Sequence, residues 1–187
     1  MPNTAPATVN NNKAKTRTAT CFFNAKNTTK GYTNVIPIPN NLMIFINDFF
    51  NRINHIWWRS QTDNMHLGVP TDCPHREKGP YTGDGEVACV TVMHNFDAAS
   101  FYTKWMRDIS DCQDVETGYI PNGAPWHPGC GGGVGWGAAM NVIPWEFYLH
   151  YGDRDILEEH YHAMTEHLRN MRSWMLEDGT MHQRMHD

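Results

Sequence analysis

The chain has 187 residues, of which 40% are hydrophobic and 12% aromatic, and its formal net charge at pH 7 is −5. This length and composition suffice for one modest folded domain, and the sequence has no apolar run of about 18 residues that would predict a membrane span. Residues 1–33 contain five Lys or Arg and no acid, so all twenty Asp and Glu lie in the rest of the chain. An acidic folded part argues against a nucleic-acid partner, which needs a basic face.

The cysteine, histidine and glycine patterns argue against metal and cofactor sites. The five cysteines are scattered and odd in number, without a CxxC pair, so we interpret them as free, mostly buried thiols. The eleven histidines show no recognised ligand spacing. The glycine run at residues 129–137 lacks the GxxxxGK(S/T) pattern of a phosphate-binding loop. We therefore predict no metal ion and no cofactor.

The start of the chain predicts a tail followed by a helix. Residues 1–40 are rich in Asn, Thr and Pro, which is typical of a poorly ordered tail and linker. A helix is then predicted from about Leu42 to just before His66, because apolar residues recur on one face at helical spacing. That face comprises Leu42, Phe45, Ile46, Phe49, Phe50, Ile53, Ile56 and Trp57.

A second helical region is predicted over residues 85–112, with a break near Asn95. Asp97 follows the break and is a suitable N-cap for the second part, whose apolar stripe begins at Phe101. The next segment, residues 113–137, contains eight glycines, three prolines and two tryptophans, which predicts an irregular loop.

The last part of the chain predicts two further helices and no strand. Residues 140–151 are apolar nearly all round, which indicates a buried helix, and Asp153 or Asp155 would cap the helix that follows. Similar stretches, ETGYIP from Glu116 and EDGTM from Glu177, each follow a predicted helix. Repeated helix pairs predict an all-α toroid of helical hairpins, with a plain helical bundle as the alternative. So few helices would leave a toroid incomplete and its apolar faces exposed.

The stretch GVPTDCPHREKGPYTGDGEV, residues 68–87, is the part of the sequence that points to chemistry. It places three acids, Asp72, Glu77 and Asp84, within thirteen residues of a turn-rich segment. Ionised carboxylates accept strong hydrogen bonds from sugar hydroxyls, and glycosidic cleavage needs one carboxylic acid to protonate the leaving oxygen. Because neighbouring carboxylates cannot all ionise cheaply, we assign the retained proton to Glu77, the central acid with the longest side chain.

The neighbours of these acids leave other interpretations open. The basic residues His75, Arg76 and Lys78 would oppose a retained proton, so we expect them to point elsewhere or to engage the two aspartates. Asp72 could instead form an Asx turn, and Asp84 could N-cap the next helix. Residue types alone thus predict a candidate carbohydrate site without excluding a solvated surface loop.

Three ordered blocks of the chain resemble the catalytic domain of the α-L-rhamnosidases, glycoside hydrolase family 78. They are TDCPHREKGPYTGDGEV, HNFDAASFYTKWMRDISDCQ and GGGVGWGAAMNVIPWEFYLHYGDRDILEEHY, and the resemblance covers about residues 42–187. It implies that residues 41–187 are the N-terminal part of an incomplete (α/α)6 six-hairpin barrel. It also implies inverting hydrolysis of terminal α-L-rhamnosides, with a rhamnose-containing glycoside or polysaccharide as the partner and a general base beyond residue 187.

The resemblance also implies roles for single residues. The acid of the HRE tripeptide is the family's general acid, which makes Glu77 the catalytic residue. In the family, the acids of TDCP and TGD hold the sugar, and in this chain those acids are Asp72 and Asp84. The remaining residues that we assign to substrate binding are Arg76, Tyr81 and Trp136.

The chain departs from the family pattern beside the acid. Where many members have Leu-Gly-Trp, this chain has Gly-Pro-Tyr at residues 79–81, so Tyr81 is the expected aromatic wall for the methyl group of rhamnose. Many members have an acid where this chain has Ala138, which changes the expected contact near Trp136. Trp126 fits sugar contact and core packing equally. The tryptophans on predicted helices are expected to pack: Trp57, Trp58, Trp105, Trp145 and Trp174.

Two other functions stay open at this point: an inactive truncated remnant and a non-catalytic helical binding module. Because the resemblance places the general base outside the chain, we expect this segment alone to be inactive. The start of the chain has no apolar signal core, so the localisation is undetermined, with a secreted or periplasmic parent enzyme as one alternative.

Overall fold

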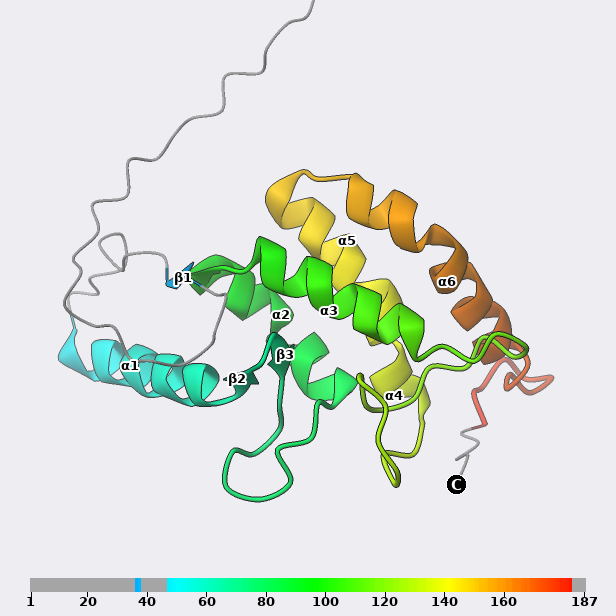
Figure 1. Ribbon diagram of the computed structural model, residues 1–187, viewed down its shortest axis with the longest axis horizontal. Coiled ribbons are helices and arrows are strands. Elements are labelled where there is room, and N and C mark those ends of the chain that lie inside the picture. Colours follow the sequence, from blue (N-terminus) through cyan, green and yellow to red (C-terminus); the bar gives the residue numbers. More distant parts are fainter. Residues whose placement is uncertain (1–35, 38–46, 183–187) are drawn as a thin grey trace, which may run out of the picture.

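The computed structural model describes residues 36–37 and 47–182. These residues form mainly helices, which confirms the predicted all-α class (Figure 1). The helices are α1 (Asp48–Asp63), α2 (Thr82–Asn95), α3 (Ala99–Asp111), α4 (Val134–Gly137), α5 (Ala139–Tyr151) and α6 (Asp155–Arg172). Two short antiparallel pairs accompany them: β1 (Ile36–Pro37) with β4 (Phe96–Asp97), and β2 (Met65–His66) with β3 (Val69–Pro70). The predicted tail, except residues 36–37, and the predicted helix start at Leu42 lie outside the described residues.

Helix α1 begins at Asp48 because the side chain of Asn47 caps it. The Asn47 Oδ1 accepts the backbone N–H of Phe49 at 2.8 Å, which satisfies one of the free donors of the first turn. The predicted apolar face is only partly used. Trp57 and Trp58 pack against Phe96, with ring centroids 6.1 Å apart in both pairs. The residues of that face that remain exposed are Phe49, Phe50, Ile53 and Ile56.

The break after α2 lies at Asn95 as predicted, but the expected cap of α3 was wrong. Asp97 belongs to the short strand β4, where its backbone is extended and pairs with Ile36. The residue at the N-cap is Ala98, which has no capping side chain, and its N–H donates to the hydroxyl of Tyr151 at 3.2 Å. Because Asp97 is paired in a strand, the N-cap lies one residue later, at Ala98, and the helix begins at Ala99.

Helices α5 and α6 are joined by a short turn, in which the Asp153 side chain accepts a backbone N–H at the start of α6, as predicted for a capping residue. The Asp153 Oδ1 accepts the N–H of Asp155 at 2.9 Å, although Arg154 occupies the N-cap position itself. Helix α5 was expected to be buried all round, and this was wrong for part of its surface. Trp145 is 51% exposed and Leu149 is 57% exposed, so Trp145 is not a packing residue in this structure.

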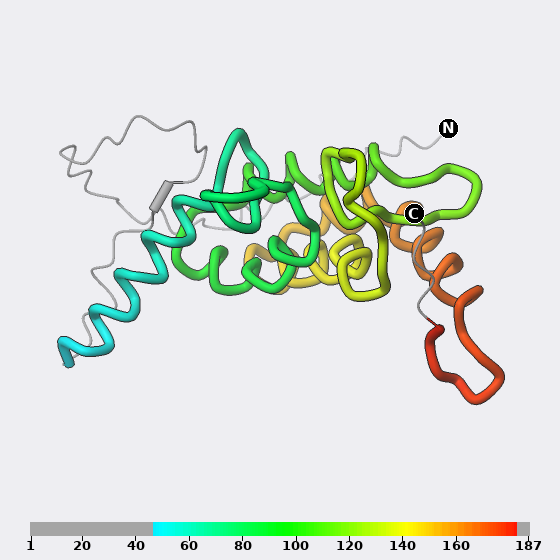
Figure 2. Tube along the Cα trace, turned by 90° about the horizontal axis from the view of Figure 1, so that it is seen from below, coloured from blue at the N-terminus to red at the C-terminus, as the bar shows by residue number. Residues whose placement is uncertain are grey.

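The core lies where α5 packs against α2, α3 and α6 (Figure 1). Helix α1 and the C-terminal turn project away from this group at opposite ends, as the second view shows (Figure 2). Burial of large apolar side chains stabilises this arrangement. The largest fully buried ones include Trp105, Tyr102, Phe96, Phe101, Phe147, Met93 and Met140.

Helices α3 and α6 are each followed by a turn in which an aspartate accepts hydrogen bonds from a threonine. After α3, Asp114 Oδ1 accepts the N–H and hydroxyl of Thr117, both at 2.7 Å. After α6, Asp178 Oδ1 accepts the N–H and hydroxyl of Thr180, at 2.9 and 2.6 Å. The spacing differs, three residues in the first turn and two in the second. What the two turns share with the sequence echo is a glycine with a positive φ two residues after a glutamate, 76° at Gly118 and 82° at Gly179.

The helices leave apolar side chains exposed on their outer surfaces. Besides the exposed face of α1, Val87 on α2 and Leu149 on α5 are exposed. This is what an open segment of a toroid is expected to show. Within the described residues, no helix combines the length and apolar character needed to cross a membrane. Cys73, Cys89, Cys112 and Cys130 are free thiols, of which Cys89 and Cys130 are buried.

Candidate functional site

The loop between β3 and α2, residues 71–81, is closed on itself by hydrogen bonds, and we call it the acid loop. The Asp72 N–H donates to the Gly79 carbonyl at 3.1 Å, and the Gly79 N–H donates back to the Asp72 Oδ1 at 2.9 Å. Between them, the carbonyl of Cys73 accepts the N–H groups of Arg76 and Lys78, both at 3.3 Å. Lys78 adopts a left-handed conformation, with a φ of 54°, which turns the chain back toward Asp72. The fold of the loop thus places Glu77 opposite Asp72.

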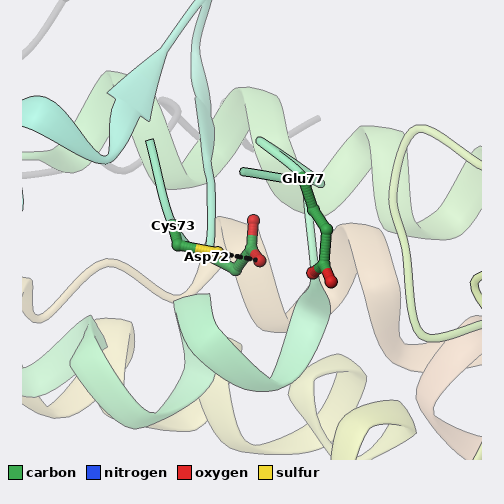
Figure 3. A group of neighbouring side chains, drawn as sticks. All are labelled: Asp72, Cys73 and Glu77. Atoms are coloured by element: carbon green, nitrogen blue, oxygen red, sulfur yellow. Dashed lines mark hydrogen bonds between the residues drawn. The ribbon is translucent and has the colours of Figure 1, made fainter. Parts of the chain in front are cut away.

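Asp72, Cys73 and Glu77 form a compact group of side chains (Figure 3). One carboxylate oxygen of each acid and the Cys73 Sγ lie within 4.8 Å of one another. The Cys73 thiol donates a hydrogen bond to the Asp72 Oδ2 at 2.9 Å. Partial burial alone would raise the pKa of Asp72. Hydrogen bonds from Cys73 and Glu77 and from backbone N–H groups outweigh this effect and lower the pKa to about 2. Asp72 is therefore firmly ionised.

Glu77 and Arg76 lie at the open side of the loop. The Arg76 Nη2 is 3.1 Å from the Glu77 Oε1, and 45% of the Glu77 side chain is exposed. The expectation that Arg76 would point elsewhere or engage an aspartate was therefore wrong. The adjacent side chains both extend into solvent, where an ion pair between neighbours forms without displacing any packing. Glu77 is accessible to a large substrate from this side.

Tyr81 and Asp84 bring the start of α2 into the same group. Burial raises the pKa of Tyr81, and the negative charges of Glu77 and Asp72 raise it further. Burial likewise raises the pKa of Asp84, with the charge of Asp72 as the next cause. Asp84 lies in the first turn of α2 and is not its N-cap, which is Tyr81. The alternative in which Asp84 only caps this helix was wrong.

The glycine-rich segment, residues 113–137, packs along the acid loop and is hydrogen-bonded to it. The Thr82 N–H and hydroxyl both donate to the Asn122 carbonyl, at 2.7 and 3.1 Å. The Ala124 N–H donates to the Pro80 carbonyl at 3.0 Å. The ring of Tyr81 meets His127 edge to face, with centroids 5.7 Å apart. Two segments distant in the sequence therefore form one surface.

Trp136 lies against the first turn of α2. A methyl group placed on Gly83 would come within 2.7 Å of the Trp136 ring, so only glycine permits this contact. Trp136 is 45% exposed and Trp126 is 60% exposed, whereas Trp105 is buried in the core. The Trp136 ring thus lies against Gly83, the residue that precedes Asp84 in the sequence.

Sequence reasoning missed the part that Cys73 and His127 play in this group. Cys73 was interpreted as one of several free thiols, and its place beside Asp72 in TDCP was the only signal available. The spacing of Asp72, Cys73 and Glu77 would admit a cation. The same spacing is equally that of a hydrogen-bonding set, and nothing else in residues 47–182 points to an ion. The geometry suits hydrogen bonding to a polyhydroxylated ligand.

Residues 46–185 match the family model of the bacterial α-L-rhamnosidase six-hairpin glycosidase domain. The chain belongs to this family. It is 33% identical over 150 residues to an α-L-rhamnosidase of Formosa agariphila, covering 75% of this chain and 16% of that protein. Among solved structures, it is similar to the α-L-rhamnosidase from Dictyoglumus thermophilum, with a TM-score of 0.63 and 31% identity, covering 75% of this chain and 15% of that one. It is also similar to the Streptomyces avermitilis α-L-rhamnosidase complexed with L-rhamnose, with a TM-score of 0.57 and 33% identity, covering 64% of this chain and 12% of that one.

Membership of the six-hairpin family confirms the resemblance seen in the sequence and explains the exposed apolar faces. The chain spans only 16% of the length of the Formosa agariphila relative. The matched residues include the whole acid loop, α2 and the glycine-rich segment, and therefore every residue of the candidate site. The incomplete six-hairpin barrel that we expected is thus supported by sequence and by structure.

Proposed function

We propose that this chain supplies the general acid and the sugar-binding acids of an α-L-rhamnosidase. The substrates are terminal α-L-rhamnosides in glycosides or polysaccharides. The observation that carries this proposal is that the acid loop brings the carboxyl groups of Asp72 and Glu77 within 4.8 Å of each other in a six-hairpin domain of this family. One similar structure is of an α-L-rhamnosidase complexed with L-rhamnose.

Glu77 is the proton donor in this proposal. As the general acid, Glu77 must hold the proton that it gives to the leaving oxygen. Its side chain is 45% exposed, which leaves its carboxyl group open to a leaving group. The Arg76 pair opposes this, but exposed ion pairs are weak and a bound sugar would displace the guanidinium.

Asp72, Asp84, Tyr81 and Trp136 hold the sugar in this proposal. Ionised Asp72 accepts hydrogen bonds from ring hydroxyls, and Asp84 does so from the first turn of α2. Tyr81 and Trp136 provide the aromatic surface against which the methyl group of rhamnose packs. This combination of acids and aromatic rings selects a deoxy sugar over one that carries a hydroxymethyl group.

The proposed mechanism is inverting, and the general base lies outside the described residues. An inverting pair of carboxyl groups stands about 6.5 to 9.5 Å apart to leave room for the attacking water. Asp72 and Glu77 are closer than this, so Asp72 is not the base. Hydrolysis of an α-L-rhamnoside with inversion releases the β-anomer of rhamnose first, because water attacks from the opposite face of the ring.

The test uses Glu77→Gln in the protein that carries this chain. Turnover of an aryl α-L-rhamnoside should fall by at least about a hundredfold, the lower range for loss of a general acid, while L-rhamnose still binds. Glu158→Gln, at an exposed position on α6, is the matched control and should keep full turnover. Retained turnover in Glu77→Gln would refute the assignment, and α-rhamnose as the first product by proton NMR would refute inversion. Sugar binding without any wild-type turnover would favour a binding module.

A further inference from the structure

Cys73 donates a hydrogen bond to Asp72, the acid that the proposed function assigns to sugar binding. Both oxygens of the Asp72 carboxylate are engaged by donors from its own loop: Oδ1 accepts the Gly79 N–H at 2.9 Å, and Oδ2 accepts the Cys73 thiol at 2.9 Å. The terminal torsion of an aspartate is broad, so a carboxylate held at one oxygen can still rotate. Two donors on different oxygens fix the plane of the group. Each oxygen keeps a lone pair for a ligand, because a carboxylate accepts about four hydrogen bonds.

The loop fixes the backbone of the residue that carries the thiol. The Cys73 carbonyl accepts the N–H groups of Arg76 and Lys78, so Cys73 lies at the centre of the turn. Cys73 is only half-buried and is absent from the apolar core. Its place in the structure is therefore that of a hydrogen-bonding residue and not that of a core thiol such as Cys89.

We propose that Cys73 is a positioning residue, whose S–H group orients the Asp72 carboxylate for the sugar hydroxyls. The proposal rests on the proposed function for its sugar-binding readout, but the orientation of Asp72 can be measured without any sugar. A hydroxyl can replace the thiol because serine offers one O–H donor at nearly the same position. A methyl group cannot, because alanine has no donor.

The experiment compares Cys73→Ala and Cys73→Ser in the full chain, with Cys112→Ala as the matched control. Cys112 is another half-buried free thiol. Its Sγ accepts the backbone N–H of Trp126 at 3.2 Å, a contact that does not involve Asp72. Loss of one hydrogen bond to a charged group should weaken L-rhamnose binding in Cys73→Ala about tenfold, measured by calorimetry. Cys73→Ser should remain within about threefold of wild type, and Cys112→Ala should match wild type.

A second readout separates this proposal from the proposed function. The carbon-13 signal of the Asp72 carboxyl should titrate at a higher pH in Cys73→Ala than in wild type, and near the wild-type pH in Cys73→Ser. If wild type fails to bind L-rhamnose, the proposed function fails, and this titration still decides the role of Cys73. Unchanged titration in a folded Cys73→Ala, or serine behaving like alanine, overturns the positioning role. Should Cys73→Ala fail to fold by circular dichroism, Cys73→Val fills the volume without a donor and replaces it.

Discussion

In the acid loop nearly every side chain is exposed or half-buried and hydrogen bonds fix the chain, whereas α3 and α5 bury large apolar side chains in the core. Asp72 is held by a backbone N–H and a thiol, and Glu77 is accessible at the open side. Trp105 on α3 and Phe147 on α5 are almost completely buried instead. Chemistry and stability are therefore carried by different residues, so the acids can be altered without unfolding the helices.

The two regions meet at Trp105. Its indole N–H donates to the Ala124 carbonyl in the glycine-rich segment at 2.9 Å. A methyl group placed on Gly85 in α2 would come within 2.1 Å of its ring. The side chain that fills the centre of the core thus also supports the helix and the segment that carry the site. This contact is where the separation between the two regions should fail.

The largest effect is expected from Trp105→Ala. It removes a fully buried ring and leaves the Ala124 carbonyl without its donor, which should lower the free energy of unfolding by about 3 to 5 kcal/mol. Urea unfolding followed by far-UV circular dichroism measures this. Trp126→Ala, at a side chain that is 60% exposed, is the matched control and should change little. Equal effects of the two variants would show that burial does not govern the helical region.

A smaller effect is expected from acid, through His167 on α6. Burial lowers the pKa of His167 from 6.5 to about 4, and its Nδ1 donates to Asn141 Oδ1 on α5 at 2.6 Å. Because the folded state favours the neutral ring, its contribution is complete above pH 6.5 and is lost as the pH falls toward 4. The loss amounts to roughly 3 kcal/mol.

His167→Gln removes this titration while keeping a polar side chain. Between pH 7 and pH 4, its free energy of unfolding should fall less steeply than that of wild type. Part of the slope should remain, because burial also lowers the pKa of His160. His162→Gln, on the exposed side of the same helix, should keep the wild-type slope. A wild-type slope in His167→Gln would contradict the assignment of the acid sensitivity to the α5–α6 contact.

The smallest effect on stability is expected in the acid loop. Arg76→Ala removes an ion pair between exposed side chains and should leave the midpoint of urea unfolding unchanged. The same change should alter the pH dependence of turnover, because it removes the positive charge next to Glu77. A clear loss of stability would show that the loop contributes to the fold more than its exposure indicates.

The sequence was sufficient for the helices and for the three acids, because both depend on local patterns. Apolar spacing located α1 and α6, and the TDCPHRE and TGD motifs located Asp72, Glu77 and Asp84. The features that the sequence could not show depend on contacts between distant segments. Asp97 has the character of a cap, but its pairing with Ile36 removed it from that position.

Two further differences have the same origin. Trp145 has the pattern of a buried residue, but burial needs neighbours, and its contact with the Tyr148 ring leaves it 51% exposed. Cys73 has no distinctive pattern at all, and its importance appears only once the loop has closed through Gly79. Local chemistry is therefore readable from the sequence, whereas its arrangement required the structure.

The link between Thr82 and the Asn122 carbonyl, 40 residues apart in sequence, has a consequence for how the site can vary. Both donors of Thr82 bind the same carbonyl, so the start of α2 is tied directly to the glycine-rich segment. Insertions or deletions in the glycine-rich segment would tilt Tyr81 and Trp136 relative to the carboxylates while the acids themselves stayed intact. If the proposed function holds, changes in this segment would alter substrate preference without altering a catalytic group.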